Sequence, residues 1–333
     1  CHDPILTNGT FTGCNDTYLT KNYYIVAPGS DITTTDAGGE WSTETKSGTS
    51  FSAPHVTASL AILKQAWPQL TSKQLVDLIL STATDMGEVG VDDVYGVGML
   101  NLDNATNPQG VSEVSTLAGN SNVYATSMTT SSVIGDSLSS VSALDSTMVV
   151  DSYNRDYYID LNQTVNSIDS ALTLEHNFMS FSGTEQIYFD GYTVAINDRN
   201  LDNFALGYQH GACGYVIGNL QEDSTFLGTS GSGALGLNGS QTQHIGIDCK
   251  KDGISLRYNI GQSNITGSQG SIITNGRAMV DTWMIGYNTK NWQFGVGQPL
   301  AVRQGDLNLN VASSIDTDGT HNYTDYKLDM DIN

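Results

Sequence analysis

The sequence of 333 residues lacks several features that would assign it at once to a known class. It has no run of about 18 apolar residues, which excludes a transmembrane helix. It does not open on a charged segment followed by an apolar run, so no signal peptide is recognisable. Because it begins with Cys1 rather than Met, we expect it to be a piece of a longer precursor.

Basic residues are scarce. The chain has 13 Lys and Arg against 35 Asp and Glu, which gives a formal net charge of −22. Nucleic acids and anionic membrane surfaces are bound through clusters of Lys and Arg, so neither is an expected partner. The acidic excess instead predicts a solvated, self-repelling surface that suits an external medium.

Cysteine is also rare, with four in the chain, and no two of them form a C-x-x-C pair. This absence argues against a zinc ribbon or a thioredoxin-type site. In an exported protein, the expected disulfides would join Cys1 to Cys14 and Cys213 to Cys249. Isolated, reduced thiols are the alternative.

Two helices are predicted within residues 1–110. The first is expected to begin near Pro54 with Ser52 as its cap, because proline needs no N–H partner in the first turn of a helix. The second is expected to follow a cap at Thr71, with Gln74 three residues later, which is the pattern of a capping box.

Residues 151–333 alternate between apolar and polar side chains with a period of two, as antiparallel strands with one apolar face do. A hairpin is predicted at Lys250-Lys251-Asp252-Gly253 and another at Asn288-Thr289-Lys290-Asn291. Residues 111–150 are rich in Ser and Thr and poor in charge, and we interpret them as a linker.

The string Gly48-Thr49-Ser50-Phe51-Ser52-Ala53-Pro54-His55 carries the chemistry. A serine at the mouth of a helix meets free backbone N–H groups and the positive end of the helix dipole, which stabilise the negative charge of a tetrahedral intermediate. A glycine nearby lets a substrate backbone approach closely. A helix cap without catalysis is the alternative interpretation of Ser50, but the whole string is far more specific than a cap.

This string resembles the serine motif of the subtilases, Gly-Thr-Ser-x-Ala/Ser-x-Pro-His. Val26–Ile32 resembles the Ala-Pro-Gly segment before that serine, and Tyr95–Asn101 resembles the segment that closes the domain. The resemblance implies that residues 1–110 are the C-terminal part of an α/β catalytic domain. It also implies that Ser50 attacks the scissile carbonyl, while a His takes its proton and an Asp orients that His.

The sequence departs from the family pattern on the amino side of Ser50. The family order is Asp, His, Asn and then Ser, and only 49 residues precede Ser50. We therefore expect the catalytic Asp and His in an upstream part of the same precursor. His2 lies too close to be the family's His, His55 belongs to the motif and is structural in the family, and Asn8 lies nearer than the oxyanion Asn usually does.

The second half resembles a more specific group. The stretch Asp151-Ser152-Tyr153-Asn154-Arg155-Asp156-Tyr157 is similar to one that follows the protease domain of subtilase autotransporters, and Phe294–Leu300 is similar to strands of their C-terminal region. The resemblance implies an antiparallel all-β domain over 151–333 that forms part of an outer-membrane β-barrel, incomplete at Asn333. A soluble β-sandwich or half-barrel gives the same alternation, so both interpretations stay open.

No cofactor and no metal site are predicted. His210, His244 and His321 show no metal-ligand spacing. Asp316-Thr317-Asp318-Gly319 is a fragment of a calcium loop, but the full order of ligands is missing, and a solvated acidic edge is preferred.

The sequence thus predicts a partial subtilisin-like α/β domain followed by an antiparallel β domain, in a bacterial protein that is secreted or displayed at the cell surface or outer membrane. The expected function is a serine endopeptidase for polypeptide substrates, with Ser50 as its nucleophile and with an upstream Asp and His. Residues 1–333 alone are expected to be inactive. The alternative is a non-catalytic surface, translocation or adhesion module.

Overall fold

The computed structural model describes residues 4–7, 10–14, 20–35, 43–131, 133–134, 141–168, 185–196 and 203–330. The chain divides into two compact units. Unit 1 comprises Cys1–Gly110, Asp151–Asp156 and Ile315–Thr320, and unit 2 comprises Val111–Val150, Tyr157–Ser314 and His321–Asn333. Two short segments that follow residue 150 in the sequence therefore belong to unit 1.

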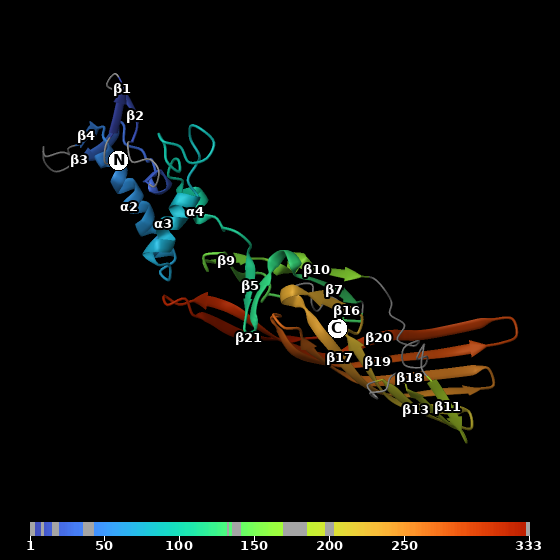
Figure 1. The fold of residues 1–333 in the computed structure, drawn as a ribbon. Helices are drawn as coiled ribbons and strands as arrows, with labels where there is room; N and C mark the ends of the chain where they lie inside the picture. The colour runs from blue at the N-terminus through green and yellow to red at the C-terminus, as the bar shows by residue number, and fades with distance from the viewer. Residues whose placement is uncertain are drawn as a thin grey trace. The chain divides into compact units, whose positions relative to one another are not determined.

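Unit 1 combines short antiparallel strand pairs with α-helices (Figure 1). The described elements are β1 (Pro4–Thr7), β2 (Thr10–Cys14), η1 (Lys21–Tyr23), β3 (Ile32–Thr35), β4 (Thr43–Lys46), α2 (Thr49–Ala66), α3 (Ser72–Ser81) and α4 (Leu102–Thr106). β1 pairs with β2, and β3 pairs with β4. Leu63 and Leu78 from helices α2 and α3, and Leu70 from the turn between them, are buried at 0–1% exposure and contribute to the core of this unit.

Helix α2 begins earlier than the sequence predicted. Its N-cap is Gly48, so Ser52 is not the cap, and Pro54 lies inside the helix. The reason is the backbone of Gly48, whose φ of +155° belongs to a region that essentially only glycine adopts. The chain therefore turns into the helix at the glycine and needs no side-chain cap.

The predicted start of helix α3 is confirmed. Thr71 is the N-cap, and its Oγ1 accepts a hydrogen bond from the backbone N–H of Gln74 at 3.3 Å. In return, the Thr71 backbone N–H donates to Gln74 Oε1 at 3.0 Å. These reciprocal bonds satisfy two of the donors that a helix start leaves unpaired.

A nine-stranded sheet dominates unit 2, in the order β11-β12-β13-β14-β17-β18-β19-β20-β21. Its neighbouring pairs from β11 to β20 are antiparallel, which confirms the predicted antiparallel β region. The strands are β11 (Glu185–Phe189), β12 (Tyr192–Ile196), β13 (Phe204–His210), β14 (Cys213–Asp223), β17 (Leu237–Lys251), β18 (Ile254–Gly267), β19 (Ile273–Asn288), β20 (Gln293–Ile315) and β21 (His321–Asp329). Among the described residues, no hydrogen-bonded pairing joins the end strands β11 and β21.

Two smaller sheets complete unit 2, in the orders β10-β7-β16-β15 and β6-β5-β8-β9. Their strands are β5 (Glu113–Thr116), β6 (Gly119–Asn122), β7 (Ser127–Ser131), β8 (Thr147–Val150), β9 (Asp156–Ile159), β10 (Val165–Ile168), β15 (Thr225–Phe226) and β16 (Thr229–Ser232). Residues 111–150, which we interpreted as a linker, therefore carry four of these strands, β5 to β8.

Both predicted hairpins are present. β17 and β18 join at Asp252-Gly253, whose φ values of +52° and +82° are the two positive values that a type I′ turn requires. Lys251 pairs with Ile254 across this turn. β19 and β20 join across residues 289–292, where Asn288 pairs with Gln293.

One expected disulfide is confirmed. Cys213 on β14 lies directly opposite Cys249 on β17, with a Cα–Cα distance of 3.9 Å, and the two sulfurs are bonded. The other expected pair involves Cys1, which lies outside the described residues.

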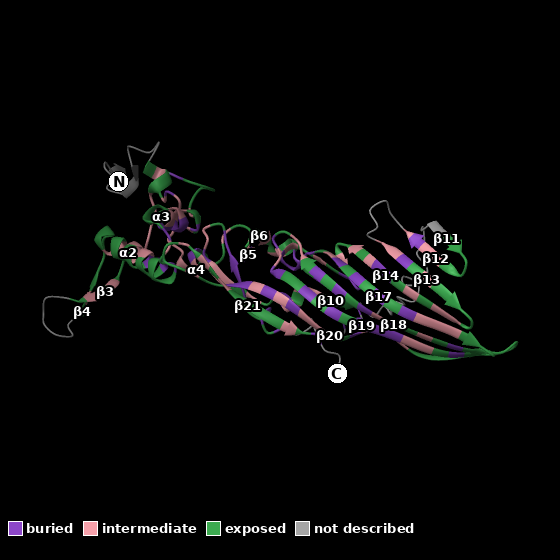
Figure 2. Ribbon diagram, turned by 90° about the horizontal axis from the view of Figure 1, so that it is seen from below, coloured by how far each residue is buried: buried purple, intermediate pink, exposed green. Residues whose placement is uncertain are grey.

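The apolar side chains of the nine-stranded sheet change face along the long strands β18 to β20. Near the hairpin tips, Ile254, Leu256 and Tyr258 lie on one face and are 55%, 43% and 38% exposed. Further along the same strand, Ile265 lies on the opposite face and is only 3% exposed. Because successive side chains in a strand alternate between faces, exposed and buried positions form bands across β17 to β20 (Figure 2).

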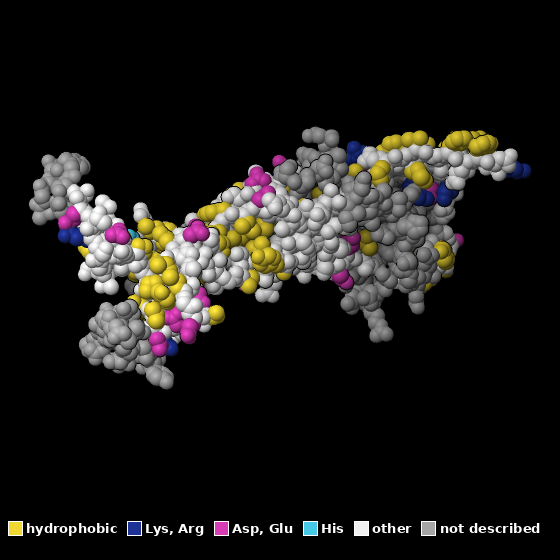
Figure 3. All heavy atoms as spheres, turned by 90° about the horizontal axis from the view of Figure 1, so that it is seen from above, with side chains coloured by type: hydrophobic (Ala, Val, Ile, Leu, Met, Phe, Trp, Pro, Cys, Tyr) yellow, Lys and Arg dark blue, Asp and Glu magenta, His cyan; other side chains and the backbone are white. Residues whose placement is uncertain are grey.

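We call the exposed apolar face near the hairpin tips the apolar tip face. Cross-strand register extends it over several strands, since Tyr215 pairs with Ile247 and Leu256 pairs with Ile285. Figure 3 shows hydrophobic side chains gathered near this end of the sheet. Its exposed members include Leu206, Tyr208, Tyr215, Ile217, Ile245, Ile254, Leu256, Tyr258, Ile285, Tyr287, Phe294 and Val296.

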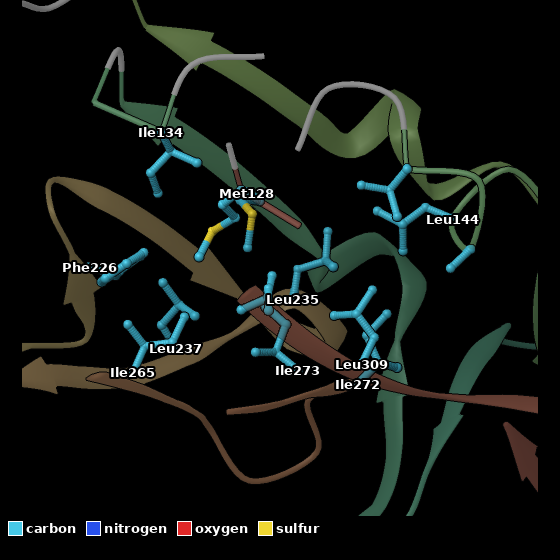
Figure 4. Packing of buried hydrophobic residues seen from close by; sticks show 14 of the residues in the cluster. Met128, Ile134, Leu144, Phe226, Leu235, Leu237, Ile265, Ile272, Ile273 and Leu309 are labelled. Atoms are coloured by element: carbon cyan, nitrogen blue, oxygen red, sulfur yellow. The ribbon is translucent and has the colours of Figure 1, made fainter. Parts of the chain in front are cut away.

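Away from the tips, the sheet contributes to a hydrophobic core in which its other face packs on the smaller sheets (Figure 4). Ile265, Ile273 and Leu309 come from β18, β19 and β20, while Met128 comes from β7 and Phe226 from β15. Each of these five side chains is at most 3% exposed. Across the described residues, no helix is long and apolar enough to span a membrane.

Candidate functional site

Ser50 occupies the amino end of helix α2. It is the second residue of the helix and is exposed to solvent, directly after Thr49 and the Gly48 cap. At this position the backbone N–H groups of the first turn have no partner within the helix, and the helix dipole presents its positive end. The hydroxyl therefore lies where a developing negative charge would be stabilised.

The turn before Ser50 is held by the segment that contains Gly29. The backbone N–H of Gly48 donates to the Gly29 carbonyl at 2.7 Å, and the backbone N–H of Asp31 donates to Ser47 Oγ at 2.9 Å. A side chain on Gly29 would place its Cβ 2.2 Å from Ser52 Oγ, which is closer than atoms can approach. Glycine at 29 is thus required for the two segments to touch.

The segment Tyr95–Asn101 lies alongside the same region. The backbone N–H of Val97 donates to the Tyr24 carbonyl at 2.9 Å, and the N–H of Leu100 donates to the Val26 carbonyl at 2.8 Å. Gly96 has a φ of +62°, and a Cβ there would lie 2.3 Å from the Tyr24 carbonyl oxygen. The three segments that resemble subtilases are therefore brought together by backbone contacts.

The histidine of the motif makes a contact within its own helix. His55 is half-buried, and its Nδ1 lies 2.7 Å from the Phe51 carbonyl oxygen. It is the single histidine of unit 1 that the structure describes, since His2 lies outside the described residues, as does Asn8. The described part of unit 1 thus presents an exposed serine at the amino end of a helix. Its described histidine, His55, bonds within its own helix and is not placed by these contacts as a base for Ser50.

The acidic positions considered for a metal serve as turn residues. The N–H of Gly319 donates to the Asp316 carbonyl at 2.9 Å, and the N–H of Thr320 donates to Asp318 Oδ1 at 2.9 Å. That second bond is the main reason why the pKa of Asp318 lies below its usual value. Among the residues that the structure describes, no group of three or more His, Cys, Asp or Glu is placed to hold a metal ion.

Asp92 fixes the loop that carries Tyr95. Its carboxylate accepts hydrogen bonds from the backbone N–H groups of Tyr95 at 2.6 Å, Val94 at 2.7 Å and Glu88 at 3.2 Å. The bond from Tyr95, followed by the other two, lowers the pKa of Asp92 below its ordinary value of 3.8.

This shift predicts a pH-dependent effect of Asp92→Asn. A carboxyl group with a lowered pKa in the folded state stabilises the protein above the pKa of the unfolded state, and this contribution is lost as the pH falls through the folded value. We expect Asp92→Asn to lower the melting temperature at pH 7, and the difference from the wild type to shrink below about pH 4. Thermal unfolding followed by circular dichroism across pH 2–8 measures it, with Asp93→Asn as the neighbouring control. A difference that persists unchanged at pH 2 would contradict the assignment.

Comparison with known proteins agrees with this geometry. Residues 9–98 match the subtilase family. The chain is 45% identical over 92 residues to serotype-specific antigen 1 of Mannheimia haemolytica, which covers 26% of this chain and 10% of that protein. It is 37% identical over 116 residues to an extracellular serine protease of Serratia marcescens, covering 29% of this chain and 11% of that protein.

An autotransporter is among the relatives as well. The chain is 47% identical over 60 residues to the Neisserial autotransporter lipoprotein NalP of Neisseria meningitidis serogroup B, which covers 18% of this chain and 6% of that protein. The matched segments span no more than 11% of these three relatives. The chain therefore carries a segment, residues 9–98, that is similar to the subtilase family, and an autotransporter is among the proteins that the chain resembles.

Proposed function

We propose that this chain supplies the nucleophile of a subtilisin-like serine endopeptidase, and that the nucleophile is Ser50. The observation that carries the proposal is the exposed Ser50 hydroxyl at the start of α2, in a turn held by Gly29 within the segment that matches subtilases. The catalytic Asp and His come, in this proposal, from polypeptide on the amino side of residue 1.

The proposed reaction is acyl transfer to Ser50 followed by hydrolysis. The Ser50 oxygen attacks the carbonyl carbon of a peptide bond as the His removes the hydroxyl proton, and the Ser50 backbone N–H donates to the oxyanion. The same His then protonates the leaving amine, which leaves an acyl-enzyme ester that water hydrolyses. In this proposal the substrate is a polypeptide, and an Asn side chain from the same upstream polypeptide as the Asp and His completes the oxyanion hole.

Residues 1–333 alone are expected to show no peptidase turnover, because a serine without its base loses nearly all of its activity as a nucleophile. Hydrolysis of an unstructured fluorogenic peptide by the purified chain measures this, with Ser50→Ala as the control. Turnover that disappears in Ser50→Ala would overturn the requirement for upstream residues. Turnover that persists in that variant would indicate a contaminating protease.

A second candidate function is a membrane or surface module, and the apolar tip face favours it. A monomer rarely leaves so many contiguous apolar side chains in water. Charged residues flank this face at both ends. Lys251 and Lys290 lie at the hairpin tips. At the other end of the face, Asp281 is the cross-strand partner of Ile260 and forms an ion pair of 2.7 Å with Arg303. We propose that the face contacts lipid in an outer-membrane β-barrel and that the opposite, polar face lines its interior.

The location proposed for the protein follows from the same relatives. One is named an extracellular protease and another an autotransporter, which supports secretion or display at the cell surface. The two candidate functions are distinguished by the upstream sequence of the precursor. Asp-Thr/Ser-Gly and His-Gly-Thr motifs before Cys1 would support the peptidase, whereas their absence would favour a module without catalysis.

A further inference from the structure

The stretch Asp151–Asp156 belongs to unit 1 although 40 residues of unit 2, Val111–Val150, separate it from the rest of that unit in the sequence. Within this stretch, Arg155 is completely buried, with 0% exposure. Arginine is among the residues least often buried without a partner, since removing its charge from water costs several kcal/mol. The groups that contact this side chain therefore identify the kind of residue that the surrounding surface binds.

The guanidinium of Arg155 is matched by acceptors on several sides. Its Nε and Nη2 donate to the Asp151 Oδ2 at 2.9 and 2.7 Å. Its Nη1 donates to the Ala105 carbonyl at 2.5 Å, and Nη2 donates to the Asn107 carbonyl at 2.8 Å. These two carbonyls lie at the end of helix α4, where backbone acceptors are unpaired within the helix and the dipole is negative.

An aromatic face covers the same guanidinium. Its central carbon lies 4.6 Å from the ring centroid of Trp67, which follows helix α2. A cation in this position is attracted by the ring, and more strongly where water is excluded. The residues around the site thus combine carbonyl oxygens with an aromatic wall, a set that selects a planar cation over an ammonium group.

Asp151 and Ser152 make further hydrogen bonds to the same surface, through the backbone of Gln109. The backbone N–H of Gln109 donates to Asp151 Oδ2 at 3.0 Å, and the backbone N–H and hydroxyl of Ser152 both donate to the Gln109 carbonyl, at 3.0 and 2.7 Å. Gln69 Nε2 donates to the Asn154 carbonyl at 3.1 Å. Residues from two stretches of 1–110, 67–69 and 105–109, therefore converge on one short segment.

We propose that the surface formed by Trp67, Gln69 and residues 105–109 is a peptide-recognition site for an Asp-x-x-x-Arg segment, and that its occupant is Asp151–Asp156 of the same chain. The segment acts as a clasp that holds residues 1–110 to the polypeptide that follows residue 150. Recognition rests on the arginine fork and its carboxylate partner, so the site accepts the same sequence as a separate peptide. The proposal is independent of whether Ser50 is catalytic.

The test cuts the chain between the clasp and its site. A recognition sequence for a specific protease is inserted between Gly110 and Val111, which are both exposed, and the full chain is cleaved after folding. We expect the pieces 1–110 and 111–333 to elute together in size-exclusion chromatography. Arg155→Ala should weaken their association by at least about a hundredfold, because it removes the cation that is paired with the buried Asp151 carboxylate. Arg155→Lys should give only partial rescue, because lysine cannot form the fork.

Two controls keep the outcome clear. Lys73→Ala removes a cation that is paired with Asp77 but 83% exposed, and it should leave the association unchanged. In the wild-type cleaved protein, an excess of a synthetic peptide of residues 150–157 should release 111–333, while a peptide of the same composition in scrambled order should not. Pieces that separate in the wild type, or that stay together in Arg155→Ala and resist the peptide, would overturn the proposal.

Discussion

Replacing Ser50 with alanine in the complete precursor is expected to lower kcat by about 10⁶-fold, because the serine, histidine and aspartate of such a triad work as a unit. The fold should not change. Ser50 is exposed, and loss of one exposed hydroxyl alters the free energy of unfolding by about 0.5 kcal/mol or less. Hydrolysis of a peptide substrate, together with thermal unfolding, separates these two effects.

The matched control is Ser52→Ala, two residues further along the same helix. Ser52 is half-buried, and its hydroxyl faces the Gly29 turn rather than the helix mouth. A fluorophosphonate probe should label the precursor and the Ser52→Ala variant but not the Ser50→Ala variant. Labelling that survives in Ser50→Ala would assign the nucleophile to another residue.

Local sequence patterns predicted the parts of this fold that depend on neighbouring residues. The capping box at Thr71 and the turn at Asp252-Gly253 are determined by backbone conformations within a few residues. The predicted start of helix α2 was wrong by several residues. Pro54 suggested that the first turn of the helix lies at residue 54, whereas the backbone conformation of Gly48 makes the helix begin at Thr49.

Other features depend on what packs against a strand or segment, which the pattern alone does not show. The alternation of residues predicted one apolar face for residues 254–260. It did not predict that the apolar side chain at Ile265, further along the same strand, lies on the opposite face. That change follows from the core contributed by β7 and β15, far away in the sequence. Likewise, the motif around Arg155 was recognised, but its burial depends on Trp67 and the end of α4.

The change of face predicts a position-dependent effect of charge along strand β18. If the apolar tip face contacts lipid, an arginine at Leu256 lies in hydrocarbon and should lower the free energy of unfolding by about 2–4 kcal/mol. If the face lies in water, the same substitution at this 43% exposed position should change it by about 0.5 kcal/mol or less. The two environments therefore give clearly different results for Leu256→Arg.

Gln262→Arg provides the internal control, because Gln262 is exposed on the same face of the same strand but lies beyond the apolar stretch. Both variants are folded into phosphatidylcholine vesicles as the full chain, and unfolding in urea is followed by tryptophan fluorescence. Under the lipid proposal, Leu256→Arg is strongly destabilised or fails to insert, while Gln262→Arg resembles the wild type. Equal, small effects at both positions would place the tip face in water. A third result would assign this face to a protein partner: the chain stays soluble without lipid and forms a stable assembly, and Leu256→Arg disrupts that assembly. The reason is that the arginine would then be buried between chains without a partner for its charge.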